Sequence, residues 1–131
     1  MDINNLALDQ KKMRDGVWRK HPLAPDARVR VRLRGCKQAR EWWAENAPRE
    51  GTFENGVKID AEWLALECLA RVYLTDWEGW TDGGEPVPFS HDVASEWVHA
   101  PSLEQWANVT MGLCDDAELY RQKKAKEAGK S

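Results

Sequence analysis

The stretch that decides the fold is AEWLALECLARVYL, residues 61–74. The apolar side chains that recur here at the spacing of one helix face are Trp63, Leu66, Leu69, Ala70 and Tyr73. Further apolar residues widen this face beyond that of a surface helix, so we expect a central core helix with Trp63 and Leu66 buried. Asp60, directly before the stretch, is a suitable N-cap.

Two strands are predicted before this helix. Residues 28–34, RVRVRLR, alternate strictly, which places the aliphatic side chains on one face of a strand and four arginines on the other. Residues 16–21 are predicted to form a partner strand, because the prolines and the aspartate of 22–26 suit a turn. These segments predict an N-terminal β-hairpin, preceded by a short helix over residues 4–14.

Helices and loops alternate over the rest of the chain. Residues 37–47 have helical spacing and stop at a proline, whereas residues 48–58 and 75–89 are rich in turn-forming residues and predict loops. Ser90 is a suitable N-cap for a further short helix. Pro101 begins the last helix, in which Ser102 and Gln105 have the spacing of a capping box.

The expected fold class follows from this order of elements. It is α+β and mostly helical, with an N-terminal β-hairpin followed by a small helical bundle. We expect a single α+β domain over residues 1–118 and a charged, flexible C-terminal tail over residues 119–131.

Composition excludes several classes of function. The chain has 131 residues and a net charge of -3, so its overall charge does not favour nucleic acid or an anionic membrane. No apolar run reaches the roughly 18–20 residues of a membrane span, and residues 1–10 lack the pattern of a secretory signal. Three widely spaced cysteines, with no CxxC pair, predict reduced thiols in or near the core, as in a cytosolic protein.

The arginine strand has two interpretations. Arg28, Arg30, Arg32 and Arg34 would stand about 6.7 Å apart on one face, which roughly matches the repeat of a phosphate backbone. A solvated sheet face, or an edge protected by charge, is the alternative that the negative total charge favours.

No catalytic or metal-binding motif is present in the sequence. His21, His91 and His99 lack the spacing of a helical zinc site, and no cysteine pair supports them. The chain also lacks a GxSxG motif and a glycine-rich phosphate loop. We therefore expect a protein that is not an enzyme and has no metal and no cofactor.

Tryptophan is the residue that points to protein binding. The chain has eight tryptophans, and this residue is enriched at protein interfaces. Two of them, with Phe89, fall in the segment 75–89, where they either cover the core or form part of a partner site. The tentative partner-binding residues are Trp77, Trp80, Phe89 and Trp97.

This segment also carries a resemblance to a known family. Residues 74–80, LTDWEGW, followed by residues 84–90, GEPVPFS, resemble a pattern in tail assembly chaperones of long-tailed bacteriophages. There a D-W-x-G segment is followed by G-x-x-x-P-[FY]-S and then a helix. The order of the other elements is similar too, from a Gly-Val-Trp strand near the start to a lysine-rich end, so the resemblance covers residues 14–131.

The resemblance implies a function in the cytoplasm of the host bacterium. Proteins of this family hold the tape-measure protein while tail-tube subunits polymerise around it. A tape-measure protein is a long helix with apolar stripes, so its chaperone needs apolar or aromatic grooves for amphipathic helices. The expected partners are the tape-measure protein and the tail-tube protein.

Two alternatives and one extension stay open at this point. The alternatives are a phage-encoded inhibitor of a host protein, and a nucleic-acid-binding accessory protein that uses the Arg28–Arg34 strand. The family also often makes a longer product by ribosomal frameshifting. Lys123-Lys124 and Gly129-Lys130 are codon pairs that can supply a slippery sequence, so a longer form of the chain is a further expected partner.

Overall fold

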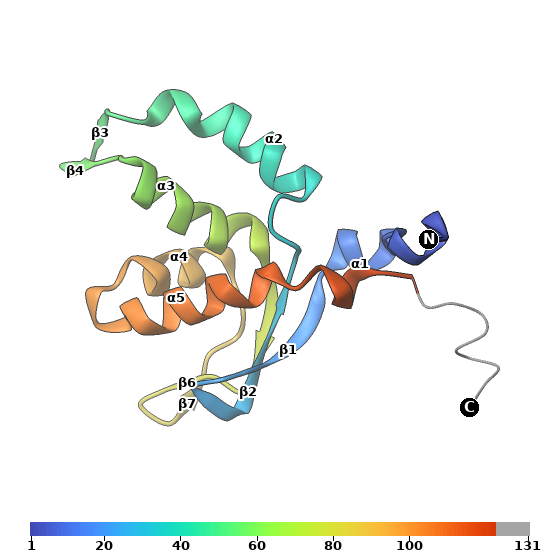
Figure 1. Ribbon diagram of the computed structural model, residues 1–131. Helices are drawn as coiled ribbons and strands as arrows, with labels where there is room; N and C mark the ends of the chain where they lie inside the picture. The colour runs from blue at the N-terminus through green and yellow to red at the C-terminus, as the bar shows by residue number, and fades with distance from the viewer. Residues whose placement is uncertain (123–131) are drawn as a thin grey trace.

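The computed structural model describes residues 1–122 and is 52% helical and 23% strand, which confirms a mixed and mostly helical domain (Figure 1). The helices are α1 (Gln10–Asp15), α2 (Lys37–Asn46), α3 (Ala61–Cys68), α4 (His91–His99) and α5 (Glu104–Gly112). Shorter helical turns are η1 (Ile3–Leu6), η2 (Ala47–Arg49), η4 (Pro101–Leu103), η5 (Leu113–Asp115) and η6 (Ala117–Tyr120), and η3 (Leu69–Tyr73) is a π-helix.

The predicted N-terminal hairpin is matched only in part, because its second strand begins inside the predicted turn 22–26 and ends at Val31 instead of Arg34, and it belongs to a larger sheet. Strands β1 (Val17–His21) and β2 (Ala24–Val31) pair antiparallel, and β5 (Leu74–Glu78) pairs with the other edge of β2. The sequence had predicted a loop for the residues of β5, and this was wrong. The predicted alternation is confirmed for Val29 and Val31, which are both fully buried beneath the sheet.

The central helix has its predicted start but a different buried face. Asp60 accepts a hydrogen bond from the backbone N–H of Trp63, as expected of an N-cap. Leu64 and Cys68 are fully buried, whereas Trp63 and Leu66 are only half-buried, so their predicted core position was wrong. The apolar arc covers most of the helix, and the sequence alone does not show which part of it faces the sheet.

Two small hairpins replace the predicted loops. Strands β3 (Phe53–Glu54) and β4 (Val57–Lys58) are joined by Asn55-Gly56, two residues with positive φ. Strands β6 (Thr81–Asp82) and β7 (Glu85–Pro86) form the second hairpin.

The predicted N-terminal cap is confirmed for α4 but not for α5. Ser90 caps α4 as predicted, by accepting a hydrogen bond from the N–H of Val93. The predicted capping box of α5 was wrong, because Ser102 lies inside η4 and the N-cap residue, Leu103, makes no side-chain cap.

The folded part extends beyond residue 118, where we had placed the domain boundary. Tyr120 is fully buried, and its hydroxyl donates a hydrogen bond to the carbonyl of Val31. Leu8 and Arg121 form an antiparallel bridge, so the two ends of the described chain run side by side. The rest of the predicted tail, residues 123–131, and both candidate slippery pairs lie outside the described residues.

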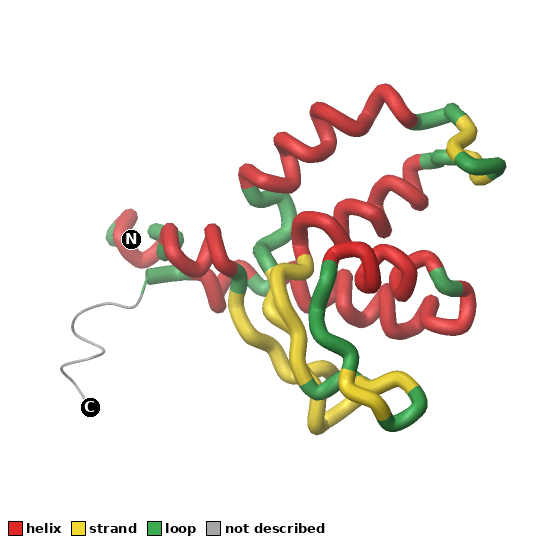
Figure 2. The backbone as a smooth tube through the Cα atoms, turned by 180° about the vertical axis from the view of Figure 1, so that it is seen from behind, coloured by secondary structure: helices red, strands yellow, loops and turns green. Residues whose placement is uncertain are grey.

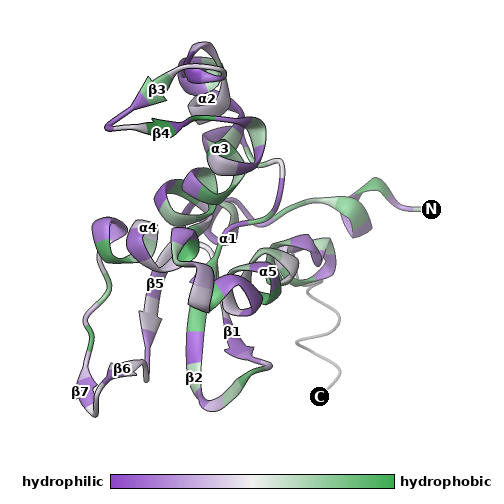
Figure 3. Ribbon diagram, turned by 90° about the vertical axis from the view of Figure 1, so that its left-hand side faces the viewer, coloured by the Kyte–Doolittle hydropathy of each residue, from purple (hydrophilic) through white to green (hydrophobic). Residues whose placement is uncertain are grey.

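The layers of the molecule can be followed from two directions. Figure 2 shows the three-stranded sheet on one side and the helices α3, α4 and α5 packed beside it. Figure 3 shows α2 with the β3–β4 hairpin at one end, and the β6–β7 hairpin at the other. Within residues 1–122, no helix is both long and apolar enough to span a membrane.

Candidate protein-binding surface

Aromatic side chains form a continuous cluster between the sheet and the α4–α5 pair. Trp77 on β5 stacks on Trp97 of α4 with ring centroids 4.7 Å apart, and Phe89 packs edge-on against it at 5.0 Å. Trp106 on α5 meets the rings of Trp77, Trp80 and Trp97 edge-on, at centroid distances between 5.7 and 6.1 Å. Such edge-on pairs stabilise a cluster beyond the area that they bury.

One side of this cluster opens to the surface as a cleft of about 270 Å³, here named the tryptophan cleft. It lies between the start of β6 and the α4–α5 turn. The residues that line it are Trp80, Thr81, Asp82, Trp97, Ser102, Leu103 and Trp106. An apolar concave surface with a few polar groups at its edge is typical of a site that binds an apolar side chain of a partner.

His21 holds one wall of the tryptophan cleft in place. Its ring packs against Trp80 edge-on at 5.0 Å and stacks with Trp106 at 6.0 Å. The backbone N–H of Leu23 donates to Nδ1 of His21, so Nε2 carries the proton and donates to the hydroxyl of Thr110, 2.9 Å away. Burial lowers the pKa of His21, which keeps the ring neutral in this hydrogen-bond chain.

Gly79 allows the chain to turn sharply after β5 and so places Trp80 in the cleft. Its φ is +86°, and a Cβ at this position would lie 2.4 Å from the carbonyl oxygen of Asp26 and 2.9 Å from Cα of Ala27. Both atoms are backbone of β2 and cannot rotate away. The close contact between β2 and the end of β5 therefore explains why this position of the D-W-x-G segment is a glycine.

The four predicted site residues divide into three groups. Trp80 and Trp97 are half-buried and line the tryptophan cleft. Trp77 is only 4% exposed, and its indole N–H donates to the carbonyl of Val87, so this side chain belongs to the core and cannot contact a partner directly. Phe89 is half-buried behind Trp77 and is not part of the cleft lining.

Trp106 is the residue of the cleft that the sequence analysis missed. It is only 6% exposed and belongs to the core, but it also lines the cleft. Its indole N–H has no hydrogen-bond partner among the described residues. The available signal was the pairing of Trp97 and Trp106 on two consecutive short helices, although their mutual orientation depends on tertiary packing.

The arginines of the second strand make contacts within the protein instead of forming a free row. Arg28 forms an ion pair with Glu78 on the neighbouring strand, and its guanidinium lies 4.2 Å from the ring centre of Trp18. Arg30 donates to the hydroxyl of Thr75.

The other two arginines lie beyond the end of β2. Arg32 donates to the carbonyl of Val72, and Arg34 forms an ion pair with Asp115. Side chains held apart in this way are poorly arranged for a phosphate backbone, so the contacts weigh against the nucleic-acid alternative.

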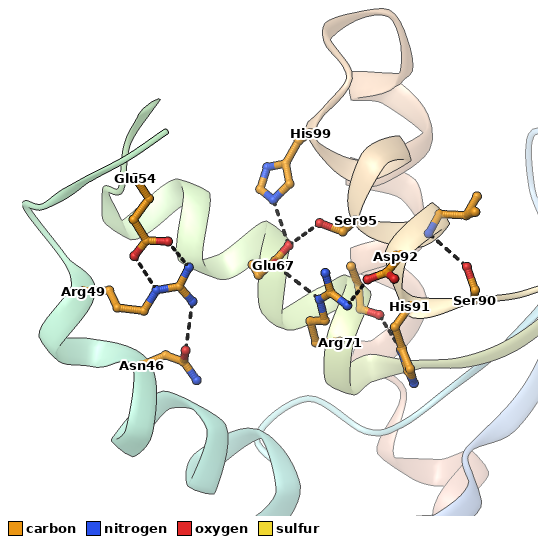
Figure 4. Close-up of polar contacts among 12 residues, drawn as sticks. Asn46, Arg49, Glu54, Glu67, Arg71, Ser90, His91, Asp92, Ser95 and His99 are labelled. Carbon is orange, nitrogen blue, oxygen red and sulfur yellow. Dashed lines mark hydrogen bonds and ion pairs between the residues drawn. The ribbon is translucent and has the colours of Figure 1, made fainter. Parts of the chain in front are cut away.

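A polar cluster joins α3 to α4 (Figure 4). Glu67 is 8% exposed and accepts hydrogen bonds from Ser95, His99 and Arg71. Burial alone would raise the pKa of Glu67, but these three donors outweigh it and lower the pKa to about 2. The carboxylate is therefore ionised and fastens the two helices together.

This cluster does not have the geometry of a catalytic triad. Ser95 donates to Glu67 at 2.6 Å and not to His99, so the imidazole does not contact the hydroxyl that it would have to activate, and a carboxylate whose pKa is lowered to about 2 is a poor proton acceptor. Within residues 1–122, no group of three or more His, Cys, Asp or Glu side chains is placed to hold a metal ion.

The three cysteines are all buried, as the sequence predicted. Burial raises the pKa of Cys68 and of Cys114 to about 12, so neither side chain is a thiolate at neutral pH.

Comparisons with known proteins add no relative to this description. No protein-family model matches the chain, and neither the curated proteins nor the solved structures gave a match. The function is therefore argued from the surface itself and from the resemblance in residues 74–90.

Proposed function

We propose that the protein is a tail assembly chaperone that binds the tape-measure protein of a long-tailed bacteriophage in the host cytoplasm. The observation that carries the proposal is the tryptophan cleft, an aromatic surface groove beside two short helices. Grooves of this kind accept the apolar stripe of an amphipathic helix, which is the repeating feature of a tape-measure protein.

The position of the resembling motif supports the same proposal. The D-W-x-G segment supplies Trp77, which supports the cleft from the core, and Gly79, which sets the turn into Trp80. The following P-F-S segment ends at Ser90, the cap of α4, and α4 carries Trp97 into the cleft. Trp77, Gly79 and Ser90 of the motif therefore contribute to building or positioning one surface.

The chemistry of the cleft suits a chaperone that must later release its partner. Its lining combines three tryptophans with Ser102, Thr81 and Asp82, and its volume accommodates only a few side chains. Contacts of this size are individually weak, so many copies can hold a long helix and the polymerising tail tube can displace them.

The test compares cleft variants for binding to fragments of the tape-measure protein by calorimetry. Trp80→Ala and Trp97→Ala should each weaken binding by over about 1 kcal/mol, as expected for aromatic side chains that anchor a partner. Trp42→Ala is the matched control, because Trp42 is also half-buried but lies on α2, outside the cleft. Equal losses from all three variants would contradict the proposed site.

A further inference from the structure

A second groove, of about 300 Å³, lies between α3 and the α4–α5 pair. The tryptophan cleft faces β6, whereas this groove, here named the α3–α5 groove, is lined by residues of α3, α4, η4 and α5. In Figure 1 the start of α3, which follows the β3–β4 hairpin, and the α4–α5 turn lie at the same edge of the molecule. The groove and the tryptophan cleft share no lining residue.

The interior of the α3–α5 groove is apolar and made of small side chains. Val98 and Ala107 are 2% and 1% exposed and form its deepest part, while Ala65 and Leu66 are half-buried along one wall. Small residues leave space between the helices, so an apolar side chain from outside can enter and lose its contact with water. The half-buried state of Leu66, unexpected from the sequence, has its explanation here.

The rim of the α3–α5 groove is acidic. Glu62 on α3 and Glu104 on α5 both line it and are both exposed, and within residues 1–122 neither forms an ion pair. They lie on different helices that face each other across the groove. A partner that enters between them meets two carboxylates without internal counter-charges.

The basic side chains near the α3 wall of the groove already contact carboxylates within the protein. His99 lines the groove, stacks on Trp63 at 4.6 Å and donates to Glu67. Two arginines that do not line the groove are also paired. Arg49 forms a two-point ion pair with Glu54, and Arg71 bridges Glu67 and Asp92 (Figure 4). The uncompensated charge of the groove is therefore negative.

We propose that the α3–α5 groove is a second docking site, for an amphipathic helix whose apolar side chain is flanked by lysine or arginine. The apolar side chain enters between Leu66 and Val98, and the flanking cations pair with Glu62 and Glu104. Partly desolvated pairs of this kind contribute more to the choice of partner than to affinity. The site is separate from the tryptophan cleft and does not depend on the identity of the partner bound there.

The test uses two designed helical peptides of about 18 residues, long enough to form a helix. Both carry the same leucine stripe, and they differ only in flanking lysines or flanking glutamates. Fluorescence anisotropy of the labelled peptides measures binding to the full chain. The lysine peptide should bind at least about tenfold more tightly, and the difference should shrink at high salt.

Charge reversal gives the sharper result. The double variant Glu62→Lys/Glu104→Lys should reverse the preference, so that the glutamate peptide binds more tightly. Glu96→Lys is the matched control, because Glu96 is an exposed carboxylate of α4 outside the groove, and it should leave the preference unchanged. Thermal unfolding of each variant confirms that the fold is retained.

Four outcomes would overturn the proposal. Equal affinity for both peptides, or an unchanged preference in the double variant, would mean that the acidic rim does not select the partner. Loss of lysine-peptide binding in Trp97→Ala would place that peptide in the tryptophan cleft instead. Concentration-dependent dimerisation that the double variant abolishes, without peptide binding, would assign the groove to a second copy of the chain.

Discussion

Alanine at Gly79 tests the close contact of β5 with β2 that positions the tryptophan cleft. Gly79 and Gly84 both have a positive φ of nearly the same size, +86° and +87°. They differ in their surroundings, because a Cβ on Gly84 meets nothing within 4 Å, whereas one on Gly79 lies 2.4 Å from the oxygen of Asp26. The pair therefore separates backbone strain from steric overlap.

The expected magnitudes follow from these two contributions. A left-handed conformation costs a non-glycine residue about 1–2 kcal/mol, and this cost is common to both variants. Gly79→Ala must in addition move one strand away from the other, because the atoms that its Cβ meets are backbone, so we expect a total above about 3 kcal/mol.

Thermal unfolding followed by circular dichroism measures the difference. With roughly 4 °C per kcal/mol for a domain of this size, Gly84→Ala should lower Tm by about 4–8 °C and Gly79→Ala by more than about 12 °C. Equal decreases in Tm would refute the reasoning, because they would show that the β2–β5 contact accommodates a methyl group without cost.

Three further predictions concern the core and its titrating groups. Leu64→Ala should cost about 2–5 kcal/mol and the half-buried Leu66→Ala less than about 2, measured by urea denaturation; the opposite order would contradict the buried face of α3. Because burial lowers the pKa of His21, this side chain binds more protons in the unfolded protein than in the folded protein. Stability should therefore fall as pH decreases below about 6.5, and His21→Asn should weaken this dependence. The thiols of Cys68 and Cys114 should react with Ellman's reagent only after unfolding, since burial raises the pKa of each to about 12; rapid labelling of the native protein would place them at the surface.

Local signals in the sequence predicted the local features of the fold. The alternation around Val29 and Val31, and the N-caps Asp60 and Ser90, depend on neighbours within a few residues, and all of them were correct. Ser102 shows the limit of such signals, because the capping pattern was present but the chain forms a 3-10 turn there.

Features that depend on distant parts of the chain were not predictable in this way. Strand β5 is short, and it exists because β2 offers an edge to it, with Val29 opposite Trp77. The burial of Trp77 and the exposure of Trp80 follow from that pairing and from the turn at Gly79. The tryptophan cleft was therefore predicted in composition, through Trp80 and Trp97, but Trp106 and the shape came only from the packing of α4 against α5.

The α3–α5 groove left no signal at all in the sequence. Glu62 and Glu104 are ordinary surface carboxylates when considered singly, and they line one groove only because α3 packs beside the α4–α5 pair.

We propose that the tryptophan cleft keeps a long amphipathic helix soluble, and co-expression of the two proteins measures this activity. The tape-measure protein is produced in bacteria with the wild-type chain or with the double variant Trp80→Ala/Trp97→Ala, and the soluble fraction is quantified after centrifugation. The wild-type chain should keep the tape-measure protein in the supernatant and co-purify with it, whereas the folded double variant should leave it in the pellet. Equal solubility with both chains, or with no chain at all, would contradict the account.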